Sequence, residues 1–205
     1  EMCLYGYSRL NEIKEKYSQT DIMGYLEKIL LVCKENNKKV ILGGPFIKEE
    51  KVFNSLYLIS YKKGIENVYS KMHLIDCEKK YFNKGTFYKI LKFDFLKVGL
   101  LICWDSAFSE VSRLYAKAGA DFIIISAAWE KTFKNQWEIA GKSNAFLNSI
   151  PIIASNRVGK DNGVAFAGNS MIIDSLGNVL EKCNDMDESY IISSIDFLDE
   201  KNKRI

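Results

Sequence analysis

The sequence predicts a layered α/β fold, and two observations lead to this prediction. Its first half holds short segments rich in β-branched and aromatic residues, bounded by turn residues, which is typical of strands. Its second half alternates continuous apolar segments with a helical pattern. Strand, helix, strand is the unit of a parallel sheet. The 205 residues fit one globular domain without an internal linker.

The first half begins with a predicted helix over residues 21–35. Apolar residues recur there at helical spacing, and Asp21 is placed to cap the start. Four predicted strands follow, and we expect them to be antiparallel neighbours. These strands span Val40–Gly44, Val52–Ser60, Ile65–Lys71 and Tyr88–Phe93.

In the second half the strands become continuously apolar. Lys97–Cys103 and Asp121–Ser126 flank a helix whose apolar face includes Val111 and Tyr115. A second helix, with Trp137 on its face, and a strand over Ile150–Ser155 come next. The remaining predicted strands span Val164–Asp174, Asn178–Lys182 and Ser189–Ile195.

Composition excludes several classes of protein. The 29 Lys and Arg nearly balance the 26 Asp and Glu, and no basic stripe is present, so we expect no nucleic-acid partner. No apolar run approaches the roughly 20 residues that cross a bilayer, and no signal-peptide pattern opens the chain, so we expect no membrane contact. The five cysteines form no C-x-x-C pair, which indicates free thiols in the cytoplasm. With His73 as the one histidine, no polyhistidine metal site is possible.

Four residues could supply chemistry, although each also has an ordinary structural interpretation. Cys103 ends an apolar strand just before a helix, where ligand sites of α/β sheets lie, but an arbitrary free cysteine is usually a buried core thiol. Lys71 ends another strand, and most lysines are surface cations. Taken singly, Glu78 is likewise expected to be an exposed carboxylate, and Glu1 alone gives no indication of a function.

Their order along the chain is more informative than any one of them. Three blocks, EMCLYGY at 1–7, YSKMHL at 69–74 and GLLICWD at 99–105, resemble in order the catalytic blocks of the nitrilase, or carbon–nitrogen hydrolase, superfamily. Further matching blocks lie at 118–121, 127–130, 155–159 and 166–170. The resemblance covers essentially the whole chain.

The resemblance implies a catalytic triad of Glu1, Lys71 and Cys103, with no cofactor and no metal. Cys103 would be the nucleophile, Glu1 the general base and acid, and Lys71 the stabiliser of the oxyanion. Glu78 would hold Lys71 or orient the substrate.

Three further residues are candidates for supporting roles. The backbone N–H of Trp104 could join Lys71 in stabilising the oxyanion. Trp129 and Asn156 each follow the end of a strand and could face the same pocket as Cys103. For Trp129, core packing remains an equal alternative.

The family also implies a four-layer αββα sandwich in a single domain over residues 1–205. Its first strand and first helix have no counterpart here, so we expect a chain that is incomplete at its amino terminus. The family further implies a homo-oligomer.

For function, the resemblance implies hydrolysis of a small amide to a carboxylic acid and ammonia through a cysteine thioester. Hydrolysis of an N-carbamoyl amide or of a nitrile is the alternative within the family. A non-catalytic binding or scaffold protein of the same fold is the alternative from another class. A thiol redox protein is disfavoured, because no partner cysteine lies near Cys103.

Overall fold

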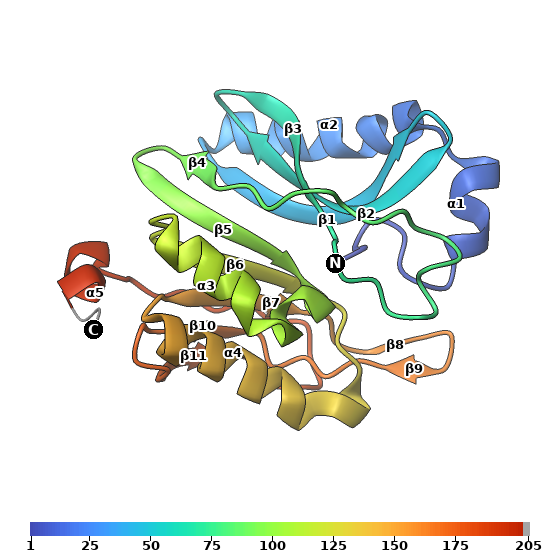
Figure 1. Ribbon diagram of the computed structural model, residues 1–205. Coiled ribbons are helices and arrows are strands. Elements are labelled where there is room, and N and C mark those ends of the chain that lie inside the picture. Colours follow the sequence, from blue (N-terminus) through green and yellow to red (C-terminus); the bar gives the residue numbers. More distant parts are fainter. Residues whose placement is uncertain (203–205) are drawn as a thin grey trace. The chain divides into compact units, whose positions relative to one another are not determined.

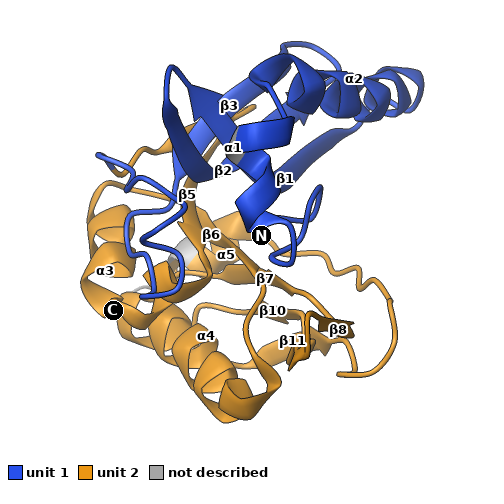
Figure 2. Cartoon of the chain, turned by 90° about the vertical axis from the view of Figure 1, so that its right-hand side faces the viewer, with its two compact units in different colours: residues 1–87 blue, residues 88–205 orange. Residues whose placement is uncertain are grey.

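The computed structural model describes residues 1–202 and has a mixed α/β fold, which confirms the predicted fold class. The chain forms two compact units, residues 1–87 and the residues from Tyr88 on (Figure 2). Each unit builds one main sheet and packs helices against it. Each therefore supplies one sheet layer and one helical layer.

Unit 1 is a three-stranded antiparallel sheet with a long helix against it (Figure 1). The strand order is β1-β2-β3, so the antiparallel pairing predicted for these three segments is confirmed. The elements of unit 1 are α1 (Leu10–Lys16), α2 (Gln19–Glu35), β1 (Lys39–Lys48), β2 (Lys51–Ser60) and β3 (Gly64–Ser70).

Helix α2 packs through its predicted apolar face. Ile22, Leu26 and Cys33 are buried and form one core cluster with Tyr57 and Ile59 of β2. Burial of such a stripe contributes most of a helix's stability in a protein.

The start of α2 differs from the prediction. The residue that caps the helix is Ser18, whose hydroxyl accepts a hydrogen bond from the Asp21 backbone N–H at 3.2 Å. The Asp21 carboxylate reaches back to the Ser18 backbone N–H at 2.7 Å. Asp21 is thus the third helical residue of a capping box, a position that suits its charge equally well.

Unit 2 is built on a six-stranded sheet of order β11-β10-β7-β6-β5-β4. Its three central strands, β5, β6 and β7, are parallel, as the strand–helix–strand pattern predicts. The elements of unit 2 are β4 (Leu91–Phe93), β5 (Leu96–Ile102), the 3₁₀ helix η1 (Cys103–Ala107), α3 (Ser109–Lys117), β6 (Phe122–Ala127), η2 (Lys131–Phe133), α4 (Lys134–Asn148), β7 (Ile152–Asn156), β8 (Lys160–Asp161), β9 (Val164–Ala165), β10 (Met171–Ile173), β11 (Val179–Lys182) and α5 (Phe197–Asn202).

Helices α3 and α4 contribute to the core of unit 2. Tyr115 of α3 and Trp137 of α4 are buried in one cluster with Leu101, Ile123 and Ile152 of the parallel strands. This core holds the carboxyl ends of β5, β6 and β7 in fixed register.

Three predicted strands are wrong in extent or absent. Of Tyr88–Phe93 only Leu91–Phe93 is a strand, and it pairs with β5 of unit 2. The Tyr88 ring packs against the Tyr115 ring. The stretch Val164–Asp174 is divided, since Gly168 and Asn169 both have positive φ angles. Ser189–Ile195 forms no strand, and its Tyr190 and Ile192 are exposed.

Residues 1–202 contain neither a candidate membrane-spanning helix nor a candidate metal-binding cluster. No helix in this part of the chain is long and apolar enough to span a membrane. Nor do the described residues contain three or more His, Cys, Asp or Glu side chains grouped so that they could hold a metal ion.

Candidate active site

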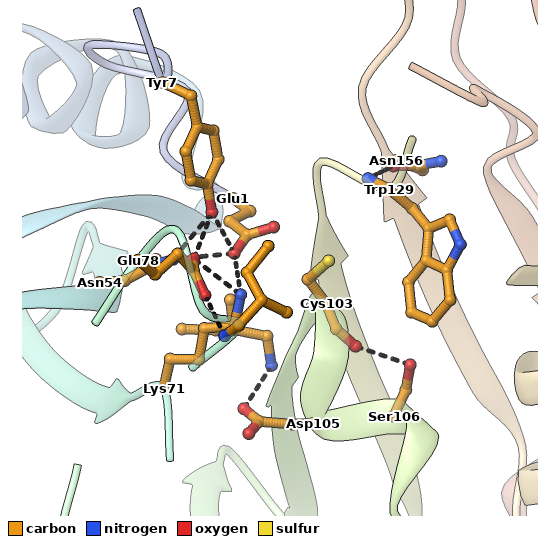
Figure 3. A network of polar contacts seen from close by, with 12 residues as sticks. Glu1, Tyr7, Asn54, Lys71, Glu78, Cys103, Asp105, Ser106, Trp129 and Asn156 are labelled. Atoms are coloured by element: carbon orange, nitrogen blue, oxygen red, sulfur yellow. Dashed lines mark hydrogen bonds and ion pairs between the residues drawn. The ribbon is translucent and has the colours of Figure 1, made fainter. Parts of the chain in front are cut away.

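A buried ion-pair cluster lies in unit 1 (Figure 3). Lys71 Nζ donates to Glu1 Oε1 at 2.7 Å and to Glu78 Oε1 at 2.9 Å. The side chain of Lys71 is 1% exposed, and those of both glutamates are 0% exposed. A buried lysine is stable only when it is paired, and here two carboxylates pair with it. The surface-cation interpretation of Lys71 is therefore wrong, as is the exposed interpretation of Glu78.

Local backbone structure places each of these three side chains. Lys71 follows the end of β3, and its N–H donates to the Asn54 carbonyl of β2 at 2.8 Å. The turn that carries Glu78 is closed by the Ile75 N–H, which donates to Glu78 Oε2 at 3.0 Å. Glu1 lies against Gly43 of β1, where an added Cβ would come within 2.8 Å of the Glu1 Cα. Only glycine leaves room for that approach.

Two residues that the sequence analysis missed complete the cluster. The Tyr7 hydroxyl lies 2.6 Å from Glu1 Oε1 and 2.7 Å from Glu78 Oε1. Asn54 Nδ2 lies 2.8 Å from Glu1 Oε1 and 3.2 Å from Glu78 Oε1. A signal existed for Asn54, since it and Ser55 interrupt the apolar residues of β2. Tyr7 belongs to the first matching block, but a tyrosine near a turn is not distinctive by itself.

The cluster keeps Glu1 ionised. Burial alone raises the pKa of a carboxyl group, but the charge of Lys71 and hydrogen bonds from Lys71 and Tyr7 lower it. The lowering effects are larger, and the pKa of Glu1 falls from its ordinary 4.5 to about 2. Glu1 is therefore a carboxylate at neutral pH.

In unit 2, Cys103 stands at a sharp turn between β5 and η1. Its φ is +46°, a left-handed conformation that costs energy for any residue except glycine. Ser106 Oγ donates to the Cys103 carbonyl at 2.7 Å, and the buried Asp105 carboxylate accepts from the Ile102 N–H at 3.1 Å (Figure 3). These two hydrogen bonds fix the backbone immediately before and after the Cys103 Cα. The Cys103 side chain is half-buried, so it is not a fully buried core thiol.

The other predicted site residues lie near the ends of the neighbouring strands. Trp104 is 39% exposed, and its ring lies 5.6 Å from the ring of Trp129. Trp129 is buried in the core of unit 2, and its Nε1 donates to the Phe133 carbonyl. This agrees with the core-packing alternative.

Asn156 ties two segments together. Its Oδ1 accepts from the Trp129 N–H at 2.8 Å, and its Nδ2 donates to the Gly168 carbonyl at 2.8 Å. It also lines a polar cavity of about 450 Å³ in unit 2. These hydrogen bonds give Asn156 a structural role. Its predicted contact with a substrate stays a prediction.

Comparison with known protein families gives a match over nearly all of the chain. The family model described as carbon-nitrogen hydrolase matches residues 1–203. A protein of Schizosaccharomyces pombe, named a probable nitrilase, is 39% identical over 169 residues, which cover 80% of this chain and 62% of that protein. An (R)-stereoselective amidase of Pseudomonas sp. is 31% identical over 176 residues, covering 85% and 62% of the two chains.

Comparison with solved structures identifies a similar fold. An amidase from Nesterenkonia sp. AN1 aligns with a TM-score of 0.80 at 20% identity, over 89% of this chain and 70% of that one. That structure is of a variant of the amidase, and it has the acetamide moiety of fluoroacetamide covalently added at the active-site cysteine. The chain described here spans about three fifths of the length of its curated relatives, at 62% in both cases above.

Proposed function

The chain belongs to the carbon-nitrogen hydrolase family, and on that premise we propose that it hydrolyses the C–N bond of a small amide to a carboxylic acid and ammonia. The observation that carries the proposal is the buried Lys71 held between two carboxylates. A fold rarely buries three charges unless they serve a purpose, and perturbed ionisable groups concentrate at functional sites. The proposed catalytic residues are Glu1, Lys71 and Cys103.

In the first half of the proposed reaction, Glu1 accepts the proton of the Cys103 thiol. The sulfur then attacks the amide carbonyl carbon, and the carbonyl π electrons move to oxygen. The Lys71 ammonium and the Trp104 N–H stabilise this oxyanion. When the carbonyl re-forms, the C–N bond breaks and the proton held by Glu1 goes to nitrogen. Ammonia leaves, and the acyl group remains on Cys103 as a thioester.

In the second half, water replaces ammonia. Glu1 takes a proton from the water molecule as its oxygen attacks the thioester carbon. The C–S bond then breaks, and Glu1 returns the proton to the sulfur. The carboxylic acid leaves, and both Glu1 and Cys103 regain their starting states.

In this proposal Glu78 is a positioning residue. Its carboxylate accepts from Lys71 at 2.9 Å and is itself fixed by the Ile75 N–H. It therefore limits the rotamers of Lys71 and helps to keep the ammonium charged. In the same proposal Trp129 and Asn156 are supporting residues, since Asn156 accepts from the Trp129 N–H and so fixes the segment that follows β6.

Amides are favoured as substrates because the Pseudomonas relative is named an amidase and the Nesterenkonia amidase carries an acetamide moiety on its cysteine. Nitriles are the second candidate, because the Schizosaccharomyces relative is named a nitrilase. With a nitrile, the same sulfur attack gives a thioimidate. N-carbamoyl amides are a third class to which the same two steps apply.

Ammonia release across a panel of small amides, N-carbamoyl amines and nitriles tests the proposal. We expect turnover on at least one aliphatic amide, with nitriles hydrolysed more slowly. Turnover on nitriles or carbamoyl compounds alone would keep the hydrolase and correct the substrate class. No turnover on any of the three classes would favour the scaffold alternative and contradict the proposed function.

A further inference from the structure

The Tyr7 hydroxyl lies between the two carboxylates of the cluster. It is 2.6 Å from Glu1 Oε1 and 2.7 Å from Glu78 Oε1, and Figure 3 shows its ring pointing toward both. Both distances are those of hydrogen bonds, but a phenolic hydroxyl has a single hydrogen. It can therefore donate to one of these oxygens at a time. Its own oxygen acts as an acceptor as well, since Asn54 Nδ2 donates to it at 3.2 Å.

The other groups on Glu1 Oε1 differ from Tyr7 in this respect. Lys71 Nζ and Asn54 Nδ2 also approach both carboxylates, and each nitrogen can only donate. Asn54 Oδ1 is buried without a hydrogen-bond partner. The Asn54 side chain thus directs its NH₂ group to the two carboxylates and leaves its oxygen unpaired. An unpaired buried oxygen is unfavourable, so the hydrogen bonds to the carboxylates must offset this cost.

The proposed mechanism asks Glu1 to alternate between carboxylate and carboxylic acid. The donors described above suit only the carboxylate, because a protonated Oε1 would point its hydrogen at donors. The Tyr7 oxygen is the one group among these three that can accept that hydrogen. A carboxylate with a pKa of about 2 is also a weak base, so its protonated form needs support.

We propose that Tyr7 is a positioning residue that holds Glu1 in both of its protonation states. When Glu1 is ionised, Tyr7 donates to it. When Glu1 has taken the thiol proton, its carboxyl hydrogen is donated to the Tyr7 oxygen, and the Tyr7 hydrogen turns to Glu78 Oε1. No proton is gained or lost by Tyr7 in this exchange. The inference rests on the proposed function, since it assigns Glu1 as the base.

The charged and titratable groups around Glu1 set the direction of the expected pH effect. They are Lys71, Glu78 and Tyr7. The Tyr7 hydrogen bond is one of the contacts that lower the pKa of Glu1. The bond that Tyr7 donates to the charged carboxylate is stronger than the bond that it accepts from the neutral acid. Removal of the hydroxyl should therefore raise the pKa of Glu1, so the fraction of ionised Glu1 falls at a higher pH than in the parent.

The test compares Tyr7→Phe with Tyr5→Phe. Both changes remove one hydroxyl and keep the ring, and the hydroxyl of Tyr5 is buried with no hydrogen-bond partner. For Tyr7→Phe we expect kcat to fall about ten- to a hundredfold, the range for a hydrogen bond to a charged group, with KM within about threefold. The acid limb of the kcat/KM profile should move to higher pH. Tyr5→Phe should keep the parent's kcat and profile.

A second measurement does not need activity. The Glu1 carboxyl is followed by ¹³C NMR in chains labelled at the glutamate side-chain carboxyl, with its signal assigned by Glu1→Gln. Tyr7→Phe should raise the pH at which Glu1 titrates toward the ordinary value of a glutamate, and Tyr5→Phe should leave it in place. If the parent hydrolyses none of the substrates, the proposed function fails. The titration then still shows whether Tyr7 controls the protonation of Glu1. A Glu1 titration that is the same in both variants overturns the proposal.

Discussion

At the scale of single residues, the site depends on Lys71. Burying an ammonium group is strongly unfavourable, and the two carboxylates that offset this cost would repel one another without it. The three charges are therefore stable only as a group. The two carboxylates also keep Lys71 charged, which is the state that the proposed oxyanion role requires.

Replacing Lys71 with alanine should thus destabilise the chain as well as abolish turnover. Removing one partner of a buried ion pair typically costs about 3–5 kcal/mol, because the remaining charges are left unpaired. Lys79→Ala is the matched control, since Lys79 pairs with Asp76 on the surface and such pairs contribute about 1 kcal/mol or less. Urea denaturation gives both free energies of unfolding. Equal values for the two variants would contradict the account of the buried cluster.

The sequence predicted part of this cluster. Glu1, Lys71 and Glu78 were found through the order of the matching blocks, whereas none of them would have been identified alone. Tyr7 and Asn54 were missed, because their importance depends on contacts across 6 to 71 positions of the chain. Periodicity reports which face a residue occupies, but not which distant group it meets.

At the scale of elements, β5 and α3 show why the strand that precedes Cys103 needs a glycine. A Cβ at Gly99 would lie 2.7 Å from the Tyr115 ring, so the absence of a side chain lets α3 lie close to the sheet. The Tyr115 hydroxyl in turn donates to the Leu100 carbonyl at 2.8 Å. The contact fixes the end of β5 just before Cys103.

Two alanine substitutions test this interpretation. Gly99→Ala should lower the free energy of unfolding by about 1–3 kcal/mol, the usual cost of overpacking a core. Gly24→Ala lies in the exposed middle of α2, where a Cβ meets nothing within 4 Å. It should raise the stability by about 0.5–1 kcal/mol, because alanine loses less entropy in a helix. Thermal or urea melts separate the two, and a neutral Gly99→Ala would refute the close approach.

Element boundaries were less predictable than the elements themselves. The helix at 21–35 and the parallel strands followed from long, clear patterns, and all are present. Ser18 was missed as the cap because Asp21 matches the same preference three residues later. Ser189–Ile195 contains β-branched and aromatic residues typical of a strand, but no partner strand pairs with it among the described residues. Local sequence carries no information about the availability of a partner strand.

At the scale of the whole molecule, the proposed triad takes residues from both compact units. Glu1 and Lys71 belong to unit 1 and Cys103 belongs to unit 2. The mechanism therefore requires the three functional groups to come within about 3–5 Å of one another. The single-domain organisation and the homo-oligomer stay predictions, as does the wider activity of a chain that spans three fifths of its relatives.

The most direct test of the central proposal is the turnover of Cys103→Ala on the best amide of the panel. Loss of the nucleophile should reduce the rate by at least about a thousandfold, while the free energy of unfolding stays within about 1 kcal/mol, since little volume is removed. Cys183→Ala, which removes another half-buried thiol of unit 2, should keep the parent's rate. If Cys103→Ala retained more than about a tenth of that rate, the covalent mechanism would be wrong.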